Sequence, residues 1–238
     1  MTKINEKDCS IIVPAYNEEK RIPSFLENLD GFEGRFIFVC DGTDDTATVI
    51  EKFAFENRQY NIKCLTYNHR LGKGGGILEG FRHLETAYCG FLDADGSASI
   101  KEMRKLFAAL ENSDCAIGSR WMPESDIKVG QGIGRKFQSR MFNLAVKILF
   151  GLSFKDTQCG AKAFRREAIL SVMHQIESRG FEFDVEVLWR LRNSGFRIKE
   201  VPIAWEDRES SHVGGFDGAG MLANLVRLKR GKVPRKPE

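Results

Sequence analysis

Residues 10–18 read SIIVPAYNE, an apolar run that ends in turn-forming and polar residues. Short apolar runs of this kind, rich in β-branched residues, are typical of strands that are buried on both faces of a sheet. Further runs follow at residues 36–40, 62–66, 88–92 and 115–117. The first half of the chain is therefore predicted to contain a series of short buried strands.

The segments between these runs have the spacing of helices. Apolar residues recur at helical intervals in residues 20–29, 45–57, 75–87 and 100–111, and Asp44 is a candidate N-cap for the second of these helices. Strands that alternate with helices predict an α/β fold, with a mostly parallel, Rossmann-like sheet flanked by helices on both faces. Such sheets bind ligands at the carboxyl ends of their strands.

The alternation ends near residue 131. From there the sequence predicts an amphipathic helix over residues 136–150, a helix around residues 184–193 and a strand near residues 198–203. The last residues, from 227 on, are basic and carry two prolines, so we expect a flexible tail over 227–238. The length of 238 residues favours one domain, which we place at residues 1–226.

Composition narrows the class of protein. Hydrophobic residues make up 42% of the chain and charged residues 29%, which excludes a disordered protein, and a net charge of +3 gives no support to nucleic-acid binding. The six cysteines show no CxxC spacing and are expected to be reduced. No signal-peptide pattern begins the sequence, and its longest apolar stretch is shorter than the ~20 residues of a membrane span. We therefore expect a cytoplasmic protein that meets a membrane at most at its surface.

Two carboxylates follow the run at residues 88–92 directly, in Asp93-Ala94-Asp95. Hard oxygen ligands suit Mg²⁺ or Mn²⁺, which often bind one or two carboxylates together with substrate phosphates. The alternative is a solvated turn, which is the more common meaning of a single DxD sequence. Other features must therefore decide between a metal site and a turn.

The earlier strand ends carry further polar groups. An aromatic ring and several carboxylates lie in residues 14–18 and 41–45, so they are expected at the same sheet edge. The ring of Tyr16 could stack on a nucleotide base or pack within its loop, and Asn17 and Asp44 could cap helices in addition to any contact with a ligand.

A glycine-rich segment, residues 70–76, precedes a predicted helix and could offer backbone N–H groups to an anion. It is not a Walker A loop, because Tyr67 stands where the first glycine is required and Gly74 follows Lys73 in place of Ser or Thr. No GxGxxG sequence follows the first strand either. Kinase and dehydrogenase functions are both disfavoured.

Taken in order, these motifs resemble the family 2 glycosyltransferases with a GT-A fold. Later motifs are similar to the branch of that family that makes dolichyl-phosphate sugars, the glucosyltransferases and mannose synthases of dolichyl phosphate. The resemblance extends from about residue 9 to 212. It rests on residues 12–18, 41–43, 72–74, 93–95 and 118–120, and for the branch on residues 156–160, 181–186 and 201–205.

The resemblance implies an inverting transfer of a hexose from UDP-glucose or GDP-mannose to a polyisoprenyl (dolichyl) phosphate. It implies a donor-binding half at about residues 9–120, an acceptor-side half at about 121–226, and Mg²⁺ or Mn²⁺ on Asp93 and Asp95. The implied donor-binding residues are Pro14, Ala15, Tyr16, Glu18, Asp41, Lys73, Asp93, Ala94 and Asp95. The implied catalytic residues are Asp93, Asp95, Arg120 and Asp184, and the acceptor phosphate would contact Arg120, Arg140, Arg208 and His212.

The sequence departs from the family pattern at three positions. Cys40 stands where the family has Asp or Asn, Ser97 where mannose synthases have a Gln, and His212 where the branch has Lys. The last of these leaves the acceptor's identity open.

A phosphate acceptor also agrees with elementary chemistry. A phosphate monoester with a second pKa of about 6 is mostly dianionic at neutral pH and needs no general base, unlike a sugar hydroxyl. It does need cations, for which Arg135 is a further candidate besides the arginines and His212 named above. Asp184 is the candidate for an acid facing the sugar; its alternative is a surface charge on a helix.

A membrane surface is a possible partner, together with a membrane-anchoring protein. The predicted helix at 136–150 has Phe137, Met141, Leu144 and Ile148 on one face, which could lie at an interface or pack on the core, and the basic tail could add attraction to an anionic leaflet. Two rival functions remain: transfer to a soluble glycan with Asp184 as base, and a catalytically impaired nucleotide-sugar or lipid-phosphate binding protein.

Overall fold

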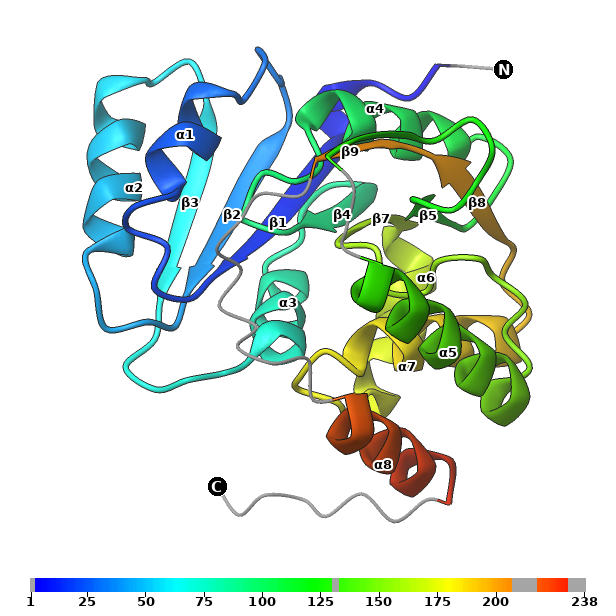
Figure 1. Cartoon of the computed structure of the whole chain (residues 1–238). Coiled ribbons are helices and arrows are strands. Elements are labelled where there is room, and N and C mark those ends of the chain that lie inside the picture. The colour runs from blue at the N-terminus through cyan, green and yellow to red at the C-terminus, as the bar shows by residue number, and fades with distance from the viewer. Residues whose placement is uncertain (1–2, 130–132, 207–217, 231–238) are drawn as a thin grey trace.

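The computed structural model describes residues 3–129, 133–206 and 218–230. Within these residues a seven-stranded sheet has the order β3-β2-β1-β4-β7-β5-β8, and β7 is antiparallel to both of its neighbours, whereas the other pairs are parallel (Figure 1). The strands are β1 Cys9–Ala15, β2 Arg35–Cys40, β3 Asn61–Thr66, β4 Tyr88–Leu92, β5 Cys115–Ser119, β7 Ala161–Arg165 and β8 Ile198–Pro202. A separate parallel pair is formed by β6 Asp126–Val129 and β9 Ala204–Glu206.

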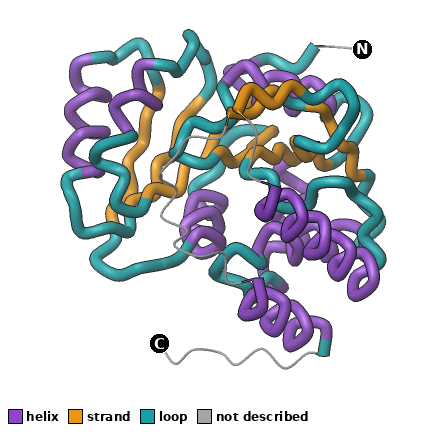
Figure 2. Tube along the Cα trace, viewed as in Figure 1, coloured by secondary structure: helices purple, strands orange, loops and turns teal. Residues whose placement is uncertain are grey.

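Helices cover both faces of the sheet, as Figure 2 shows. One hydrophobic core joins the sheet to α1, α2 and α4, and a second core joins it to α3, α5, α6, α7 and α8. The helices are α1 Ile22–Glu27, α2 Thr46–Glu56, α3 Lys73–Arg82, α4 Ile100–Ala109, α5 Ile133–Phe150, α6 Arg166–Val172, α7 Phe183–Asn193 and α8 Gly218–Lys229, with 3-10 turns at Glu6–Asp8 and Met173–Gln175. The predicted α/β architecture with a single mostly parallel sheet is confirmed.

Strands β1, β2 and β4 are mostly apolar because both of their faces are covered. In β1, Ile11 and Val13 belong to the first core and Ile12 to the second, and all three are fully buried. A strand with one solvated face would show alternating polarity instead. This is why the five predicted strands match observed strands to within a few residues.

The region that follows Cys115 was predicted less completely. No pattern in the sequence indicated β7 or α6, which carry the chain from residue 161 to 172. β7 reads AKAFR, with two alanines and a lysine, and so lacks the continuous apolar run that marks β1, β2 and β4. It nevertheless lies between β4 and β5, in the middle of the sheet.

Helix α5 presents apolar residues on two sides. Phe142 and Val146 are buried in the second core, whereas Met141, Leu144 and Ile148 are 51%, 49% and 74% exposed. The helix therefore packs on the core through one face and leaves the predicted apolar face exposed.

Helix α8 lies beside α5 and continues to Lys229, with Leu228 buried. The first residues of the predicted tail, 227–229, are thus helical; residues 231–238 lie outside the described residues. No helix in the described part of the chain is long and apolar enough to cross a membrane.

Candidate active site

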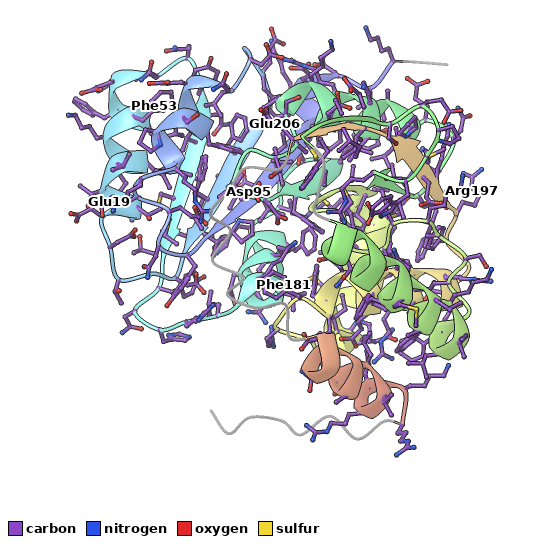
Figure 3. The ribbon with its side chains drawn as sticks, in the orientation of Figure 1. Glu19, Phe53, Asp95, Phe181, Arg197 and Glu206 are labelled. Atoms are coloured by element: carbon purple, nitrogen blue, oxygen red, sulfur yellow. The ribbon has the colours of Figure 1, made fainter. Side chains whose placement is uncertain are left out.

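The carboxyl ends of β1, β2 and β4 lie side by side because these strands are parallel neighbours. The polar loops that follow them therefore meet at one edge of the sheet, where they are joined by the start of α3 and the start of α7. Figure 3 shows Asp95, just after β4, and Phe181, just before α7, in the middle of the molecule. We describe this edge as the candidate site.

The loops after β1 and β2 are fastened to each other. Asn17 adopts a left-handed conformation with a φ of 54°, and its Oδ1 accepts a hydrogen bond from the backbone N of Thr43 at 2.8 Å. A Cβ on Gly42 would lie 2.3 Å from the same oxygen, so only glycine allows this approach. Asn17 thus ties the two loops together, which differs from the helix cap that the sequence predicted; Arg21 occupies the N-cap position of α1.

The predicted cap of α2 was wrong by one position. The helix begins at Thr46 and has Asp45 in the N-cap position, although the Asp45 side chain makes no capping hydrogen bond. The carboxylate of Asp44 accepts instead from the backbone N of Thr46 at 3.1 Å and from that of Glu19 at 3.0 Å. Asp44 therefore ties the start of α2 to the loop after β1.

Several predicted donor-binding residues already have protein partners. Asp41 is 7% exposed, and its Oδ2 accepts from the backbone N atoms of Leu71 at 2.7 Å and Gly72 at 3.1 Å. Glu18 forms a bidentate ion pair with Arg21, with both N–O distances at 2.6 Å. Asp41 therefore holds the glycine-rich loop in place, whatever else it contacts.

The ring of Tyr16 has the guanidinium of Arg70 over one face, 4.0 Å from the ring centre. Pro14 and Ala15 form the end of β1, and Ala15 and Ala94 are buried. Loop packing of Tyr16 is thus observed on one face of the ring, and stacking of a base on it stays a prediction.

The glycine-rich segment is adapted to close packing. Gly72 has a φ of +75°, and a Cβ on Gly74 would lie 2.6 Å from the Cβ of Phe183 in α7. The backbone N of Gly75 donates to the carbonyl of Arg179 at 3.2 Å. These glycines therefore let α3 approach α7, and the amide of Gly75 has a protein partner in place of the anion that we predicted for this segment.

A chain of alternating charges lies between α3, β4, β7 and α7. The Nζ of Lys73 is 2.9 Å from Asp93 Oδ1 and 3.3 Å from Asp184 Oδ2. The other oxygen of Asp184, Oδ1, is 2.5 Å from the Nζ of Lys162. Both lysines and Asp184 are largely buried, whereas the side chain of Asp93 is 35% exposed. The order Lys162, Asp184, Lys73, Asp93 leads from the core to the sheet edge.

Burial and neighbouring charges shift the pKa values of Asp93 and Lys73, two members of this row of charges. Burial raises the pKa of Asp93, with repulsion from Asp95 and Asp184 adding to it, and the attraction of Lys73 does not offset these effects. For Lys73 burial lowers the pKa, but the attraction of Asp184 and Asp93 prevails and raises it above its ordinary value. Asp93 is thus a desolvated carboxylate with two carboxylate neighbours, and an additional cation would stabilise its ionised form.

The geometry around Asp93 and Asp95 fits a divalent cation that shares its coordination with a substrate. A Cβ on Gly160 would lie 1.8 Å from Asp93 Oδ2, so the absence of a side chain there makes room for the carboxylate. Asp95 Oδ1 accepts from the backbone N of Ser97 at 2.8 Å, which orients it. Among the described residues no group of three or more His, Cys, Asp or Glu side chains is arranged to hold a metal ion. A metal here would therefore need oxygens from phosphate or water, as Mg²⁺ commonly does.

Arg120 follows β5 and is paired with Asp156. Its Nε and Nη2 lie 2.7 Å and 2.9 Å from the two oxygens of Asp156, whose Oδ2 also accepts from the backbone N of Arg120 at 3.0 Å. Burial raises the pKa of Asp156, but Arg120 outweighs burial and holds it below its ordinary value. The predicted phosphate contact of Arg120 therefore competes with an ion pair inside the protein.

The remaining predicted acceptor-phosphate residues fall where little is described. Arg208 and His212 lie outside the described residues, and for Arg140 and Arg135 only the backbone, within α5, is described. Their roles stay predictions.

Sequence reasoning missed Lys162, Gly160 and the pairing role of Asp156. Lys162 carried a usable signal, because a charged residue between the apolar residues of AKAF suggests a buried charge that needs a partner. Asp156 and Gly160 were noticed only as parts of a motif, and nothing in the sequence identifies their partners.

A mostly parallel α/β sheet with a carboxylate pair at its carboxyl edge agrees with the glycosyltransferase class and the GT-A fold that the resemblance implies. The model of the family "Glycosyl transferase family 2" matches residues 10–172. The chain belongs to this family.

The chain is 31% identical to the dolichyl-phosphate beta-glucosyltransferase of Saccharomyces cerevisiae, over 92% of this chain and 73% of that protein. Among solved structures, S. aureus TarS has a TM-score of 0.64 at 19% identity, covering 94% of this chain and 64% of that one, so the chain spans less than two thirds of TarS. Glucosyl-3-phosphoglycerate synthase from Mycobacterium tuberculosis, solved with Mn²⁺, UDP and phosphoglyceric acid, has a TM-score of 0.67 at 18% identity, covering 95% and 79%. Likeness at these identities shows the fold alone.

Proposed function

We propose that this protein transfers a hexose, with inversion, from UDP-glucose or GDP-mannose to a polyisoprenyl phosphate. The observation that carries the proposal is the convergence of Asp93 and Asp95 with Lys73 and Asp184 at the carboxyl edge of the sheet. A lone DxD sequence is more often a solvated turn, but the carboxylates of a solvated turn do not require an ion pair with a largely buried lysine such as Lys73. The similarity to a protein named for dolichyl phosphate supports the acceptor class.

Asp93 and Asp95 are the residues that we assign to Mg²⁺ or Mn²⁺. The assignment is supported by the space that Gly160 provides and by the raised pKa of the Asp93 carboxylate. A similar fold has been solved with Mn²⁺ and UDP. When bound, such an ion acts as a Lewis acid for the departing diphosphate. The chain's own contribution is to hold the carboxylates apart from the core and to place the ammonium of Lys73 beside them.

The proposed class of acceptor rests on the contacts and the burial of the Asp184 side chain. Its two oxygens are occupied by Lys162 and Lys73, and the residue is 1% exposed. A carboxylate that is buried and has both oxygens in contact with ammonium groups offers no exposed oxygen to the proton of an acceptor hydroxyl. A phosphate dianion requires no base, so this arrangement favours a phosphate acceptor over a sugar hydroxyl. Arg140, Arg208 and His212 are the proposed phosphate contacts.

Access to a lipid acceptor is proposed to occur at a membrane surface, on its cytoplasmic side. Met141, Leu144 and Ile148 form an exposed apolar stripe on α5, and Lys147 is exposed beside it. An apolar stripe flanked by basic residues suits the interface of an anionic bilayer. A membrane-anchoring partner would serve the same end.

The test is an assay with purified protein, Mn²⁺, each of UDP-glucose and GDP-mannose, and a short-chain polyprenyl phosphate in detergent. We expect one donor to give released nucleoside diphosphate and a glycolipid of inverted anomeric configuration, and we expect EDTA to abolish both. A parallel reaction contains a soluble glycan in place of the lipid; a glycosylated glycan there, with no glycolipid in the first reaction, would establish the rival transferase. Tight nucleotide-sugar binding without any transfer would establish a binding protein.

A further inference from the structure

Lys162 is a fully buried cation in the centre of the sheet. It lies on β7, opposite Phe91 of β4 and Ile117 of β5, and its side chain is 0% exposed. Its Nζ donates to the carbonyl of Cys159 at 2.7 Å and to Asp184 Oδ1 at 2.5 Å, and it lies 5.3 Å from the ring centre of Phe91. An ammonium in such a position is costly unless it is paired; Asp184 is the carboxylate that forms an ion pair with it among the described residues, and its charge also acts on Asp156.

Asp184 divides its two oxygens between two lysines. Oδ1 faces Lys162 in the core, and Oδ2 faces Lys73, which in turn contacts Asp93. The carboxylate is therefore held from below by Lys162, and its orientation determines where the ammonium of Lys73 lies. Without Lys162, a single ammonium, that of Lys73, would be left between the carboxylates of Asp184 and Asp93.

We infer that Lys162 is a positioning residue for the transfer reaction. Acting through Asp184, it holds the ammonium of Lys73 against Asp93 at the place where the diphosphate of the donor is proposed to bind. This inference rests on the proposed function for the reaction, but the contacts that it concerns belong to the chain itself. The described contacts of Lys162 include Asp184 but neither Asp93 nor Lys73, so an effect of Lys162 on these two residues passes through Asp184.

A purely structural role is the alternative, since removing one member of a buried ion pair destabilises most proteins. The two roles have different consequences for Lys73. A structural role predicts a less stable protein whose folded fraction has ordinary activity. A positioning role predicts that the folded fraction itself turns over slowly, because Asp184 is free to turn toward Lys73 and draw it away from Asp93.

The first test is Lys162→Met, which keeps the length of the side chain and removes its charge. We expect kcat to fall about 10-fold to 100-fold, as for other groups that orient a first layer of ligands, while the KM for the donor changes less than about twofold. The matched control is Glu102→Gln, which breaks the pair of another buried carboxylate, with Lys105 on α4, on the opposite face of the sheet. It should lower the unfolding temperature and leave kcat unchanged.

The second test asks whether Lys162 acts through Asp184. In an Asp184→Asn background, adding Lys162→Met should cost less than about a further twofold in kcat, because the group it positions is already altered. Multiplied losses from the two substitutions would overturn the inference, as would a wild-type kcat in Lys162→Met. If Lys162→Met does not fold, Lys162→Gln, which keeps a hydrogen-bond donor, takes its place in both measurements.

A third test is independent of activity. Crystal structures of the wild type and of Lys162→Met should show the Nζ of Lys73 within ion-pair distance of Asp93 in the first, and beyond about 4 Å in the second. Unchanged contacts of Lys73 would overturn the inference even if transfer were never observed. A wild type that transfers no sugar to any acceptor would instead overturn the proposed function and leave this measurement valid.

Discussion

Two clusters of paired charges lie near the carboxyl ends of β4 and β5, and they are built differently. The carboxylate of Asp156 accepts hydrogen bonds from three N–H groups of the single residue Arg120. The charge of Arg120 keeps the pKa of Asp156 below its ordinary value. Asp93 receives one ammonium, that of Lys73, and its pKa is raised by burial and by neighbouring carboxylates. The carboxylate of the first cluster is thus saturated within the protein, whereas in the second cluster burial and the carboxylates of Asp95 and Asp184 destabilise the ionised form of Asp93 more than Lys73 stabilises it.

The difference separates a structural ion pair from a binding site. A carboxylate whose charge is matched by a buried arginine gains little from another cation, and Asp156 uses only the Nε and Nη2 groups of the Arg120 guanidinium. A carboxylate whose ionised form is destabilised, at a partly exposed edge, gains more from a cation. On this reasoning we propose that Asp93 contacts the ligand and that the pair of Arg120 with Asp156 lies beside it.

The largest effect on transfer is expected from Asp93→Asn, which removes the negative charge of the carboxylate with almost no change in shape. We expect kcat/KM to fall about 10³-fold or more, because the residue acts on charge that develops in the transition state. Stability should be equal to the wild type or slightly higher, since a desolvated carboxylate that repels its neighbours has been neutralised. Transfer rates and thermal unfolding measured on one preparation check both statements. Full activity in this variant would remove Asp93 from the metal site.

The substitution Gly160→Ala tests sterically whether the position of the Asp93 carboxylate matters for transfer. In Gly160→Ala the new methyl group would lie where Asp93 Oδ2 is now, at 1.8 Å, so the carboxylate must move. Gly160 belongs to the same loop as Asp156, but the substitution does not touch the contacts of Asp156 with Arg120. We expect a loss in kcat/KM of about 10² with Mn²⁺ present, on the scale of a small misplacement of a catalytic group. A variant with normal activity would show that Asp93 can act from another position.

The sequence predicts the position of a residue that directly follows a recognisable strand, but not its contacts with residues that are distant in the sequence. Asp93 and Asp95 could be placed at the sheet edge because they directly follow a strand that reads as buried on both faces. The partners of Asp93 could be anticipated only in part: Lys73 lies at the start of a predicted helix, but its contact with Asp184 joins residues that no local pattern connects.

The insertion of β7 is the feature that local patterns could not reveal. β7 runs antiparallel between β4 and β5, so strands adjacent in the prediction are separated in the sheet, and Lys162 is brought under Asp184. Hydrophobic periodicity reports which residues are buried, not which strands are neighbours. Local patterns predicted the strands and helices as far as β5, but not the sheet order β3-β2-β1-β4-β7-β5-β8, so the pairs between strands had to be observed.

The smallest effect on transfer is expected from Asp156→Asn, which breaks the saturated cluster. If that pair is structural, the folded variant should retain kcat within about threefold, while the free energy of unfolding at neutral pH falls by about 3–5 kcal/mol, as when a buried pair loses one partner. The pKa of Asp156 is lowered in the folded state by Arg120, so its stabilising contribution is complete above the unfolded pKa and is lost as the pH falls through the folded pKa. Urea unfolding of the two proteins should therefore differ most near neutral pH and converge in acid. A loss of kcat as large as that of Asp93→Asn, in folded protein, would instead place Arg120 in the reaction, as the family resemblance implies.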